Sequence, residues 1–283
     1  MIKKLLGAFA LMLTCTTAMA AEGGYPLERA PDRLNDVASL QNGAKLFVNY
    51  CLNCHSANSM RYNTLAEIGL TDDQIRKNLM FTGEKVGDLM HVAMTPADAK
   101  NWFGSAPPDL SVMARAKSVN AGPSGMDYIY TYLRTFYRDA SRPSGWNNLV
   151  FPNVGMPHVL WELQGPREMT SVAMHEIHGK PGEEAGWERV TTTYDAQGYT
   201  TVNTEPVAHF HGHESVDYSF KAADPARTAA FDNDVADLSA FMGWMAEPVH
   251  LYRKKLGVWV LLFLALFLVV AWRLNAAFWK DVK

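Results

Sequence analysis

Cysteine is scarce in this chain, with three residues among 283. Cys15 lies in an apolar segment at the N-terminus, so the rest of the chain holds only Cys51 and Cys54. Two cysteines this close together cannot form the disulfide network that stabilises many small secreted domains. The pair is therefore expected to serve a local purpose, such as holding a metal or a prosthetic group.

An excess of positive charge is also missing. The formal net charge is −3, and residues 21–250 hold 18 Lys and Arg against 28 Asp and Glu, a balance of −10. An acidic domain repels the phosphate backbone, so nucleic acid is not expected as a partner. The same field can steer a basic protein toward the domain, although ordinary solubility explains the charge as well.

Long apolar runs are confined to the two ends of the chain. At the N-terminus, Lys3 and Lys4 precede an apolar run over residues 5–13 and then Ala18-Met19-Ala20. This order is typical of a secretory signal peptide, which we predict over residues 1–20, cut after Ala20. The run is too short to cross a bilayer, which needs about 20 residues. Cleavage would remove Cys15.

The second apolar run covers residues 256–272 and contains no charge. It predicts a single transmembrane helix over 251–275, followed by a cytoplasmic tail over 276–283. A buried core helix is the alternative, and the uniform Leu, Phe and Val composition argues against it. Together with a cleaved signal, this anchor would leave residues 21–250 on the periplasmic side of a bacterial inner membrane.

The two remaining cysteines stand in the pattern C-x-x-C-H. Cys51, Cys54 and His55 form the attachment motif of a c-type haem, in which both thiols add to the vinyl groups and the imidazole binds the iron. A metal or redox C-x-x-C site is the alternative, but the adjacent histidine favours one covalently attached haem c. Such proteins are assembled outside the cytoplasm, in agreement with the signal peptide.

An electron-carrying haem also needs a ligand on the opposite face of the iron, and a thioether is common there. The chain contains fourteen methionines, and most methionines in proteins fill the hydrophobic core, so a methionine alone does not identify the ligand. Met94 and Met156 both lie in Pro-containing loops, whereas Met60 is too near His55 in sequence to reach the opposite face. Spacing favours Met156 over Met94.

The apolar periodicity predicts a mostly helical chain. Gly43 lies within the helix expected before Cys51, where it costs some helix stability and indicates close packing against another element. Pro248 is expected to kink or stop the last helix before the anchor. Residues 82–111, rich in Gly and Pro, are expected to be loop. The expected helices cover residues 36–50, 72–80, 111–117, 126–137 and 232–247.

Residues 168–228 have a different character and are treated as an insertion. Residues 190–202 are rich in Thr, Tyr and Val around Ala196-Gln197-Gly198 and predict a β-hairpin. The alternating histidines 209, 211 and 213 would share one strand face, and His175 and His178 have helical spacing. Three imidazoles on one face can bind a metal, but an ordinary polar surface is favoured for both groups.

Four motifs in order carry a specific resemblance. They are CLNCH at 51–55, APPDLS at 106–111, FPNVGMPH at 151–158, and AEPVHLYRKKLG leading into the anchor. This set resembles the cytochrome c1 family, the membrane-anchored haem subunit of the cytochrome bc1 complex. The resemblance implies a mostly α, class I cytochrome c-like haem domain with long loops and a small β insertion, plus one C-terminal transmembrane helix.

The resemblance also implies roles for individual residues. It makes His55 the proximal and Met156 the distal iron ligand. In that family a basic residue after PPDLS meets a haem propionate; here the register favours Lys117, with Arg115 as the second candidate. The residues implied to line the pocket are Pro107, Pro108 and Tyr128.

The implied function is electron transfer without catalysis by the subunit itself. Electrons would arrive from the Rieske iron–sulfur protein and leave to a cytochrome c acceptor, in a complex that also contains cytochrome b. Two other classes remain open. One is a membrane-anchored c-type cytochrome of another oxidase or reductase, and the other is a haem sensor or enzyme with an open distal position.

Overall fold

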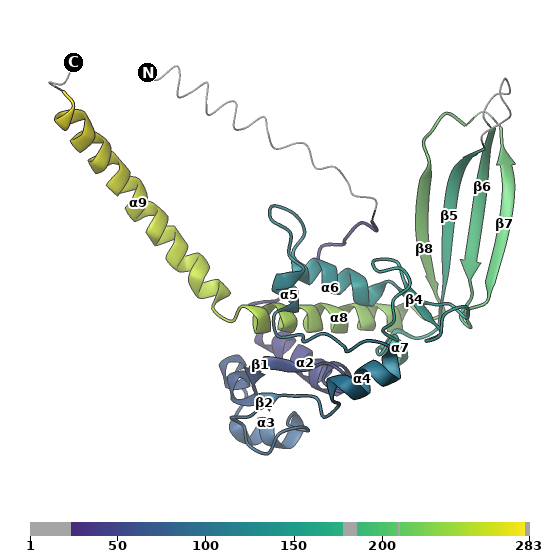
Figure 1. Ribbon diagram of the computed structural model, residues 1–283, viewed down its shortest axis with the longest axis horizontal. Helices are drawn as coiled ribbons and strands as arrows, with labels where there is room; N and C mark the ends of the chain where they lie inside the picture. Colours follow the sequence, from purple (N-terminus) through teal and green to yellow (C-terminus); the bar gives the residue numbers. More distant parts are fainter. Residues whose placement is uncertain (1–23, 178–185, 209, 281–283) are drawn as a thin grey trace.

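The computed structural model describes residues 24–177, 186–208 and 210–280. It has three parts: a body of helices, a four-stranded sheet that projects from one end of the body, and a long helix that leaves the other end (Figure 1). The predicted signal peptide lies outside the described residues.

Two helices form the centre of the body. α2 (Val37–Leu46) is capped by the Asp36 carboxylate and continues into a π-helical turn, η1 (Phe47–Cys51), that ends at the first thiol. α8 (Pro225–Ala246) packs along α2, and the rings of Phe47 and Phe241 lie 5.6 Å apart between them. An added Cβ on Gly43 would lie 2.3 Å from the Asp237 carbonyl oxygen, so glycine permits this close approach, as the sequence predicted.

Shorter elements surround this pair. A 3₁₀ helix and β1 follow the cysteine pair, and β1 pairs antiparallel with β2; β3 pairs in the same way with β4. The elements are β1 (Ala57–Arg61), η2 (Tyr62–Ile68), α3 (Asp72–Asn78), β2 (Leu89–Met90), α4 (Pro96–Phe103), α5 (Met113–Ala116), α6 (Gly125–Arg134), β3 (Phe136–Arg138), β4 (Trp146–Asn148) and α7 (Trp161–Gln164).

The expectation of loop over 82–111 was wrong for part of this segment, which contains α4 as well as the short strand β2. The Thr95 hydroxyl accepts a hydrogen bond from the Asp98 N–H, Pro96 is the first helical residue, and Gly104 ends the helix in the left-handed region at φ +78°. These are ordinary helix start and stop signals. The expected helix over 126–137 also ends early, because β3 begins at Phe136.

The insertion is a four-stranded antiparallel sheet in the order β7-β6-β5-β8. Its base packs on the body through a small cluster of Tyr137, Leu149 and Met169. The predicted hairpin is confirmed by β6 and β7, which extend beyond the predicted limits. The strands are β5 (Arg167–Ile177), β6 (Gly186–Tyr194), β7 (Thr200–Val207) and β8 (Ser215–Ala222).

The described histidines of the insertion are exposed polar residues, the interpretation that the sequence favoured, but the secondary structure implied by their spacing was wrong. His211 and His213 lie in the segment before β8, not on a strand, and His175 lies in β5, not in a helix. His178 and His209 lie outside the described residues. Among the described residues, no group of three His, Cys, Asp or Glu side chains is placed to hold a metal ion.

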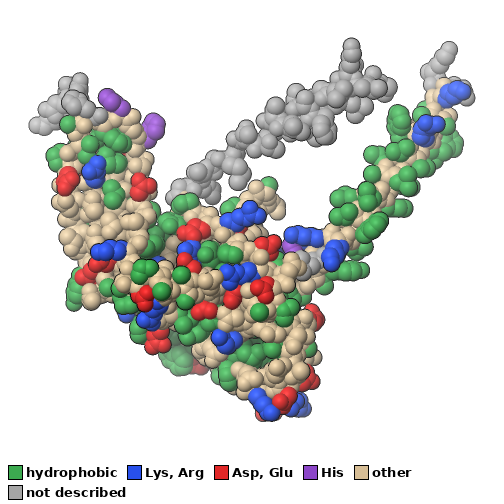
Figure 2. Space-filling view, turned by 180° about the vertical axis from the view of Figure 1, so that it is seen from behind, with side chains coloured by type: hydrophobic (Ala, Val, Ile, Leu, Met, Phe, Trp, Pro, Cys, Tyr) green, Lys and Arg blue, Asp and Glu red, His purple; other side chains and the backbone are tan. Residues whose placement is uncertain are grey.

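The long helix α9 (His250–Phe278) follows a three-residue break at 247–249, where Pro248 ends α8. Residues Tyr252–Phe278 are long and apolar enough to cross a membrane, and none of the most apolar stretch is buried by the rest of the chain. Figure 2 shows apolar side chains along its length. Helix is the commonest regular structure of the described residues, strands are also present, and one helix is a candidate span; the class I cytochrome c-like arrangement stays a prediction.

Candidate functional site

The cysteine pair lies on the turn that follows α2. The amide N–H groups of Cys54 and His55 both donate to the Cys51 carbonyl oxygen, at 3.1 and 2.9 Å. This turn brings the two thiols and the imidazole onto one short piece of backbone. Both cysteines are free thiols and half-buried, so their sulfur atoms are available for a covalent attachment.

The His55 ring is held in place by the Pro-Pro loop. Its Nδ1 lies 2.7 Å from the Pro108 carbonyl oxygen, which can only accept, so Nδ1 carries the proton. The other nitrogen, Nε2, is left as a lone-pair donor. Histidines that bind metals through one nitrogen commonly donate the other N–H to such a carbonyl.

Burial keeps His55 and the Cys51 thiol uncharged. It lowers the pKa of His55, against the opposing effects of Pro108 and Asp109, so the imidazole is neutral near pH 7. Burial, together with the neighbouring Cys54, raises the pKa of the Cys51 thiol to about 12. A neutral imidazole is the form that binds a metal.

A cavity of about 430 Å³ opens beside the second cysteine. Its lining includes Cys54, residues Pro107 and Asp109 of the Pro-Pro loop, and His91 and Met94 of the loop before α4. Cys54 and Pro107, both singled out from the sequence, therefore meet at one cavity. Met94, the alternative distal ligand, faces the same cavity as Cys54.

Met156 lies in a different environment, next to the end of α6. Its sulfur accepts a hydrogen bond from the Tyr132 hydroxyl at 3.5 Å, and the side chain packs against a cluster of Phe136, Trp146 and Val154. Sequence reasoning did not select Tyr132. Its spacing of four residues after Tyr128 on a helix is the signal that would have found it.

The Tyr132 ring begins a short row that ends at Lys117. Tyr128 stacks on Tyr132 with ring centres 5.9 Å apart, and the Lys117 ammonium lies 4.7 Å from the centre of the Tyr128 ring. Tyr132 therefore connects Met156 to Tyr128, and Tyr128 in turn contacts Lys117. Arg115 is not part of this row; it lines a separate cavity with Glu247 and His250.

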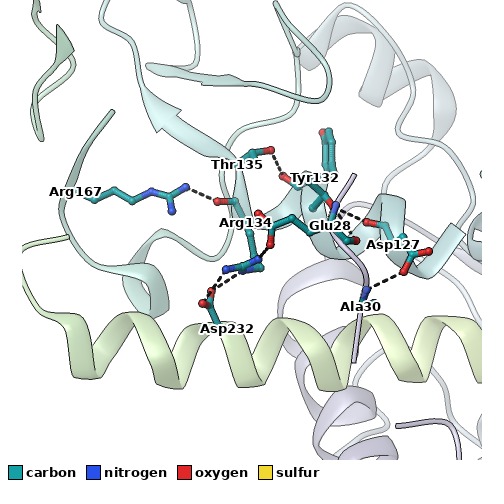
Figure 3. A network of polar contacts seen from close by, with 9 residues as sticks. Glu28, Ala30, Asp127, Tyr132, Arg134, Thr135, Arg167 and Asp232 are labelled. Carbon is teal, nitrogen blue, oxygen red and sulfur yellow. Dashed lines mark hydrogen bonds and ion pairs between the residues drawn. The ribbon is translucent and has the colours of Figure 1, made fainter. Parts of the chain in front are cut away.

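Ion pairs fix the end of α6 that carries Tyr132. Arg134 binds both carboxylate oxygens of Asp232 on α8, at 2.6 and 2.9 Å, and also pairs with Glu28 (Figure 3). Arg167, at the start of β5, donates to the carbonyl oxygens of Arg134 and Phe136. These contacts join α6, α8 and the base of the sheet behind Tyr132.

A buried histidine stands two residues after Met156. His158 is 2% exposed and its ring stacks on Phe136 with centres 4.8 Å apart, while Trp146 meets it edge-on. Neither ring nitrogen has a hydrogen-bond partner among the described residues. Burial and the charge of Arg167 lower the pKa of His158 to about 3, so the ring is neutral.

The donor set of the cysteine motif fits a c-type haem. It provides two free thiols on one turn, a neutral imidazole anchored through Nδ1 and a cavity next to Cys54. The hydrogen-bonded thioether of Met156 is the kind of second ligand that such a haem uses. Haem therefore agrees with these side chains better than zinc, which would require further Cys or His ligands.

Comparison with known proteins identifies relatives over the whole length of the chain. A family described as the Cytochrome C1 family matches residues 30–166 and 212–282. The chain is 39% identical to a cytochrome c1 from Allochromatium vinosum, covering 99% of this chain and all of that protein. It is 40% identical to a Nitrosomonas europaea protein named ammonia monooxygenase gamma subunit, with 100% and 99% covered. A Rhodospirillum rubrum cytochrome c1 is 26% identical, with 100% and 98% covered.

Proposed function

The chain belongs to the cytochrome c1 family, the haem subunits of bc1 complexes, and on this basis we propose the ligands, partners and orientation with which it transfers electrons. Family membership implies electron transfer and a haem c cofactor. We propose that one haem is bound covalently through Cys51 and Cys54, with His55 as the proximal and Met156 as the distal iron ligand. The observation that carries this assignment is the hydrogen bond from His55 to Pro108 beside the two free thiols.

Haem c, when bound, supplies an iron that gains and loses one electron. The chain's own residues hold the ligands still for this change. Pro108 fixes the His55 ring, Tyr132 holds the Met156 sulfur, and the ion pairs of Arg134 hold the helix that carries Tyr132. Ligands held in this way change position little between oxidation states, and two bound ligands leave no place for a substrate. This argues for an electron carrier over a sensor or an enzyme.

Lys117 is proposed to meet a haem propionate. Its ammonium lies over the Tyr128 ring, in the row of aromatic side chains that reaches Met156, whereas Arg115 lines another cavity. Tyr128, Pro107 and Pro108 are proposed as walls of the haem pocket. Lysine supplies a point charge in place of the bidentate fork of arginine, which is sufficient for a carboxylate at the protein surface.

The electron is proposed to come from a Rieske iron–sulfur protein and to leave to a cytochrome c, with cytochrome b in the same complex. α9 would anchor the subunit in the inner membrane with the haem domain in the periplasm. The acidic balance of residues 21–250 would then attract a basic acceptor. Raising the salt concentration should slow association with a basic cytochrome c. A rate independent of salt would remove the steering role of this charge.

Purification in a mild detergent tests the assembly. A bc1 subunit should bring cytochrome b and a Rieske protein with it, in fixed ratio to its haem. The relative named ammonia monooxygenase gamma subunit raises a second candidate, because it is as similar to this chain as the cytochrome c1 from Allochromatium vinosum. Recovery of monooxygenase subunits, without cytochrome b, would favour that role.

A further inference from the structure

A second cavity, of about 130 Å³, lies at the joint between the body and α9. Its lining includes the apolar side chains of Leu34, Met126 and Ala246 and the polar side chains of Arg115, Ser124, Glu247 and His250. A water molecule takes up about 30 Å³ in the liquid. The cavity therefore has room for a small tetrahedral group such as a phosphate.

Arg115 brings an unused positive charge to this cavity. None of the ion pairs formed within the described part of the chain includes it. The Ser124 oxygen accepts from the Asp127 N–H, which leaves the hydroxyl proton without a partner in those same residues. A guanidinium with a neighbouring hydroxyl is a typical pair of donors for a phosphate oxygen.

The acid in the cavity does not cancel this charge. One oxygen of Glu247 lies 2.6 Å from the Arg253 Nε, and the other lies 3.2 Å from the His250 Nδ1. The hydrogen bond from Arg253 lowers the pKa of Glu247, so it is a carboxylate that already has its counter-ion. Lys254 and Lys255 follow, both exposed. Figure 2 shows basic side chains where α9 leaves the body.

The position of the cavity indicates where a phosphate would come from. His250 lies two residues before Tyr252, the first residue of the candidate span. If α9 crosses the membrane, as proposed above, the cavity stands at the level of the lipid headgroups. The apolar start of α9 then offers a surface for acyl chains, with Leu256, Val258 and Trp259 exposed on it.

We propose that this cavity binds the phosphate of an anionic phospholipid, with the Arg115 guanidinium as its charged donor and Ser124 as a second donor. The site rests on the membrane-anchored function proposed above. Lys254 and Lys255 give it a preference for lipids with a net negative charge, because each basic residue near the surface attracts such lipids. A bound lipid would join α5 and α6 of the body to the first turn of α9.

The test compares lipid retained by the purified, haem-containing complex of wild type, R115Q and R189Q. Arg189 is the matched control, since it is exposed on β6, on the opposite side of the body from α9. Each sample is stripped with detergent, incubated with phosphatidylglycerol or phosphatidylethanolamine, and lipid per haem is counted by native mass spectrometry. R115Q should bind phosphatidylglycerol about tenfold more weakly, a loss of about 1.4 kcal/mol. R189Q should match wild type, and phosphatidylethanolamine should bind weakly to all three.

Equal phosphatidylglycerol binding by R115Q and R189Q would overturn the proposal. Inorganic phosphate binding to the wild type as tightly as phosphatidylglycerol does would also overturn it, because the lipid would then contribute nothing beyond its phosphate and free phosphate would be the ligand. If cytochrome b covers the cavity in the complex, the wild type will retain no lipid. That result would also refute the proposal. Haem content and co-purified subunits, measured on the same samples, report separately on the proposed function.

Discussion

The Tyr132 hydroxyl and the Met156 sulfur are joined by a hydrogen bond of 3.5 Å, between the helix α6 and the loop of the FPNVGMPH motif. Tyr132 is half-buried, and burial is the first cause that raises the pKa of its hydroxyl, followed by Tyr128. The phenol therefore remains a proton donor at any physiological pH. It can lower the electron density on the sulfur without itself changing charge.

Removing this hydrogen bond should lower the reduction potential of the bound haem. In Y132F the sulfur becomes a stronger electron donor, which favours the oxidised iron. A hydrogen bond worth about 1 kcal/mol in one oxidation state corresponds to about 40 mV for one electron, which sets the upper limit of the shift. Redox titration of Y132F measures this shift in potential. Y128F is the control, because Tyr128 stacks on Tyr132 without forming a hydrogen bond to the Met156 sulfur. Equal potentials in both variants would remove this role of Tyr132.

Met156 itself is tested by M156L, which keeps side-chain volume and removes the sulfur. The variant should fold, because exchanges between Leu and Met usually cost less than about 1.5 kcal/mol. Its absorption spectrum should lose the low-spin signature of a histidine and methionine pair, and its potential should fall. M94L is the control and should keep the wild-type spectrum. The opposite result would make Met94, which faces the cavity beside Cys54, the distal ligand.

The contact between α2 and α8 should be sensitive to a single methyl group. In G43A the new Cβ would lie 2.3 Å from the Asp237 oxygen and 2.6 Å from the Phe241 Cβ, so the helices must move apart. Overpacking of this kind costs about 1 to 3 kcal/mol, more than alanine gains over glycine in a helix. G87A is the control, because a Cβ there meets no atom within 4 Å. Urea unfolding of the two variants should differ by that amount.

His158 offers a case in which a polar side chain is expected to reduce stability. Its ring is packed among aromatic side chains, and its two nitrogens have no partner within the described ranges. H158F keeps the stacking and removes both nitrogens, so the free energy of unfolding should rise by about 1 kcal/mol. H175F, at an exposed position in β5, should change little. A lower stability for H158F would mean that the ring is bound in the native protein, by the buried Gln164 amide or by an ordered water.

The sequence was sufficient for the parts of the site that depend on local chemistry. C-x-x-C-H identifies its own thiols and imidazole, and the uniform apolar run of α9 needs no tertiary context. Gly43 gave a correct sign of close packing, although its partner Asp237 is almost two hundred residues away. Register favours Lys117 over Arg115 as the residue that meets a haem propionate, and that assignment stays a prediction. The contact of Lys117 with the Tyr128 ring, which adds support to it, is made by the fold and could not be predicted from register.

Other elements were missed for identifiable reasons. α4 was hidden because Pro96 and Gly104 were interpreted as loop residues, whereas they stand at the first and the terminating positions of a helix. The role of Tyr132 depends on a contact across 24 residues of chain. His211 and His213 alternate as strand residues do, but they lie before β8. An alternation of three histidines was too short a pattern to predict a strand.

The chain enters and leaves the projecting sheet at neighbouring points. Arg167 and Ala222 are paired residues of β5 and β8, and just outside them the Ala223 N–H donates to the Pro166 carbonyl oxygen at 3.2 Å. A short turn could join these two positions and leave the order of the helices unchanged. The sheet is therefore a module that evolution can enlarge, shorten or replace independently of the cysteine motif, and the break in the family match between residues 166 and 212 falls within it.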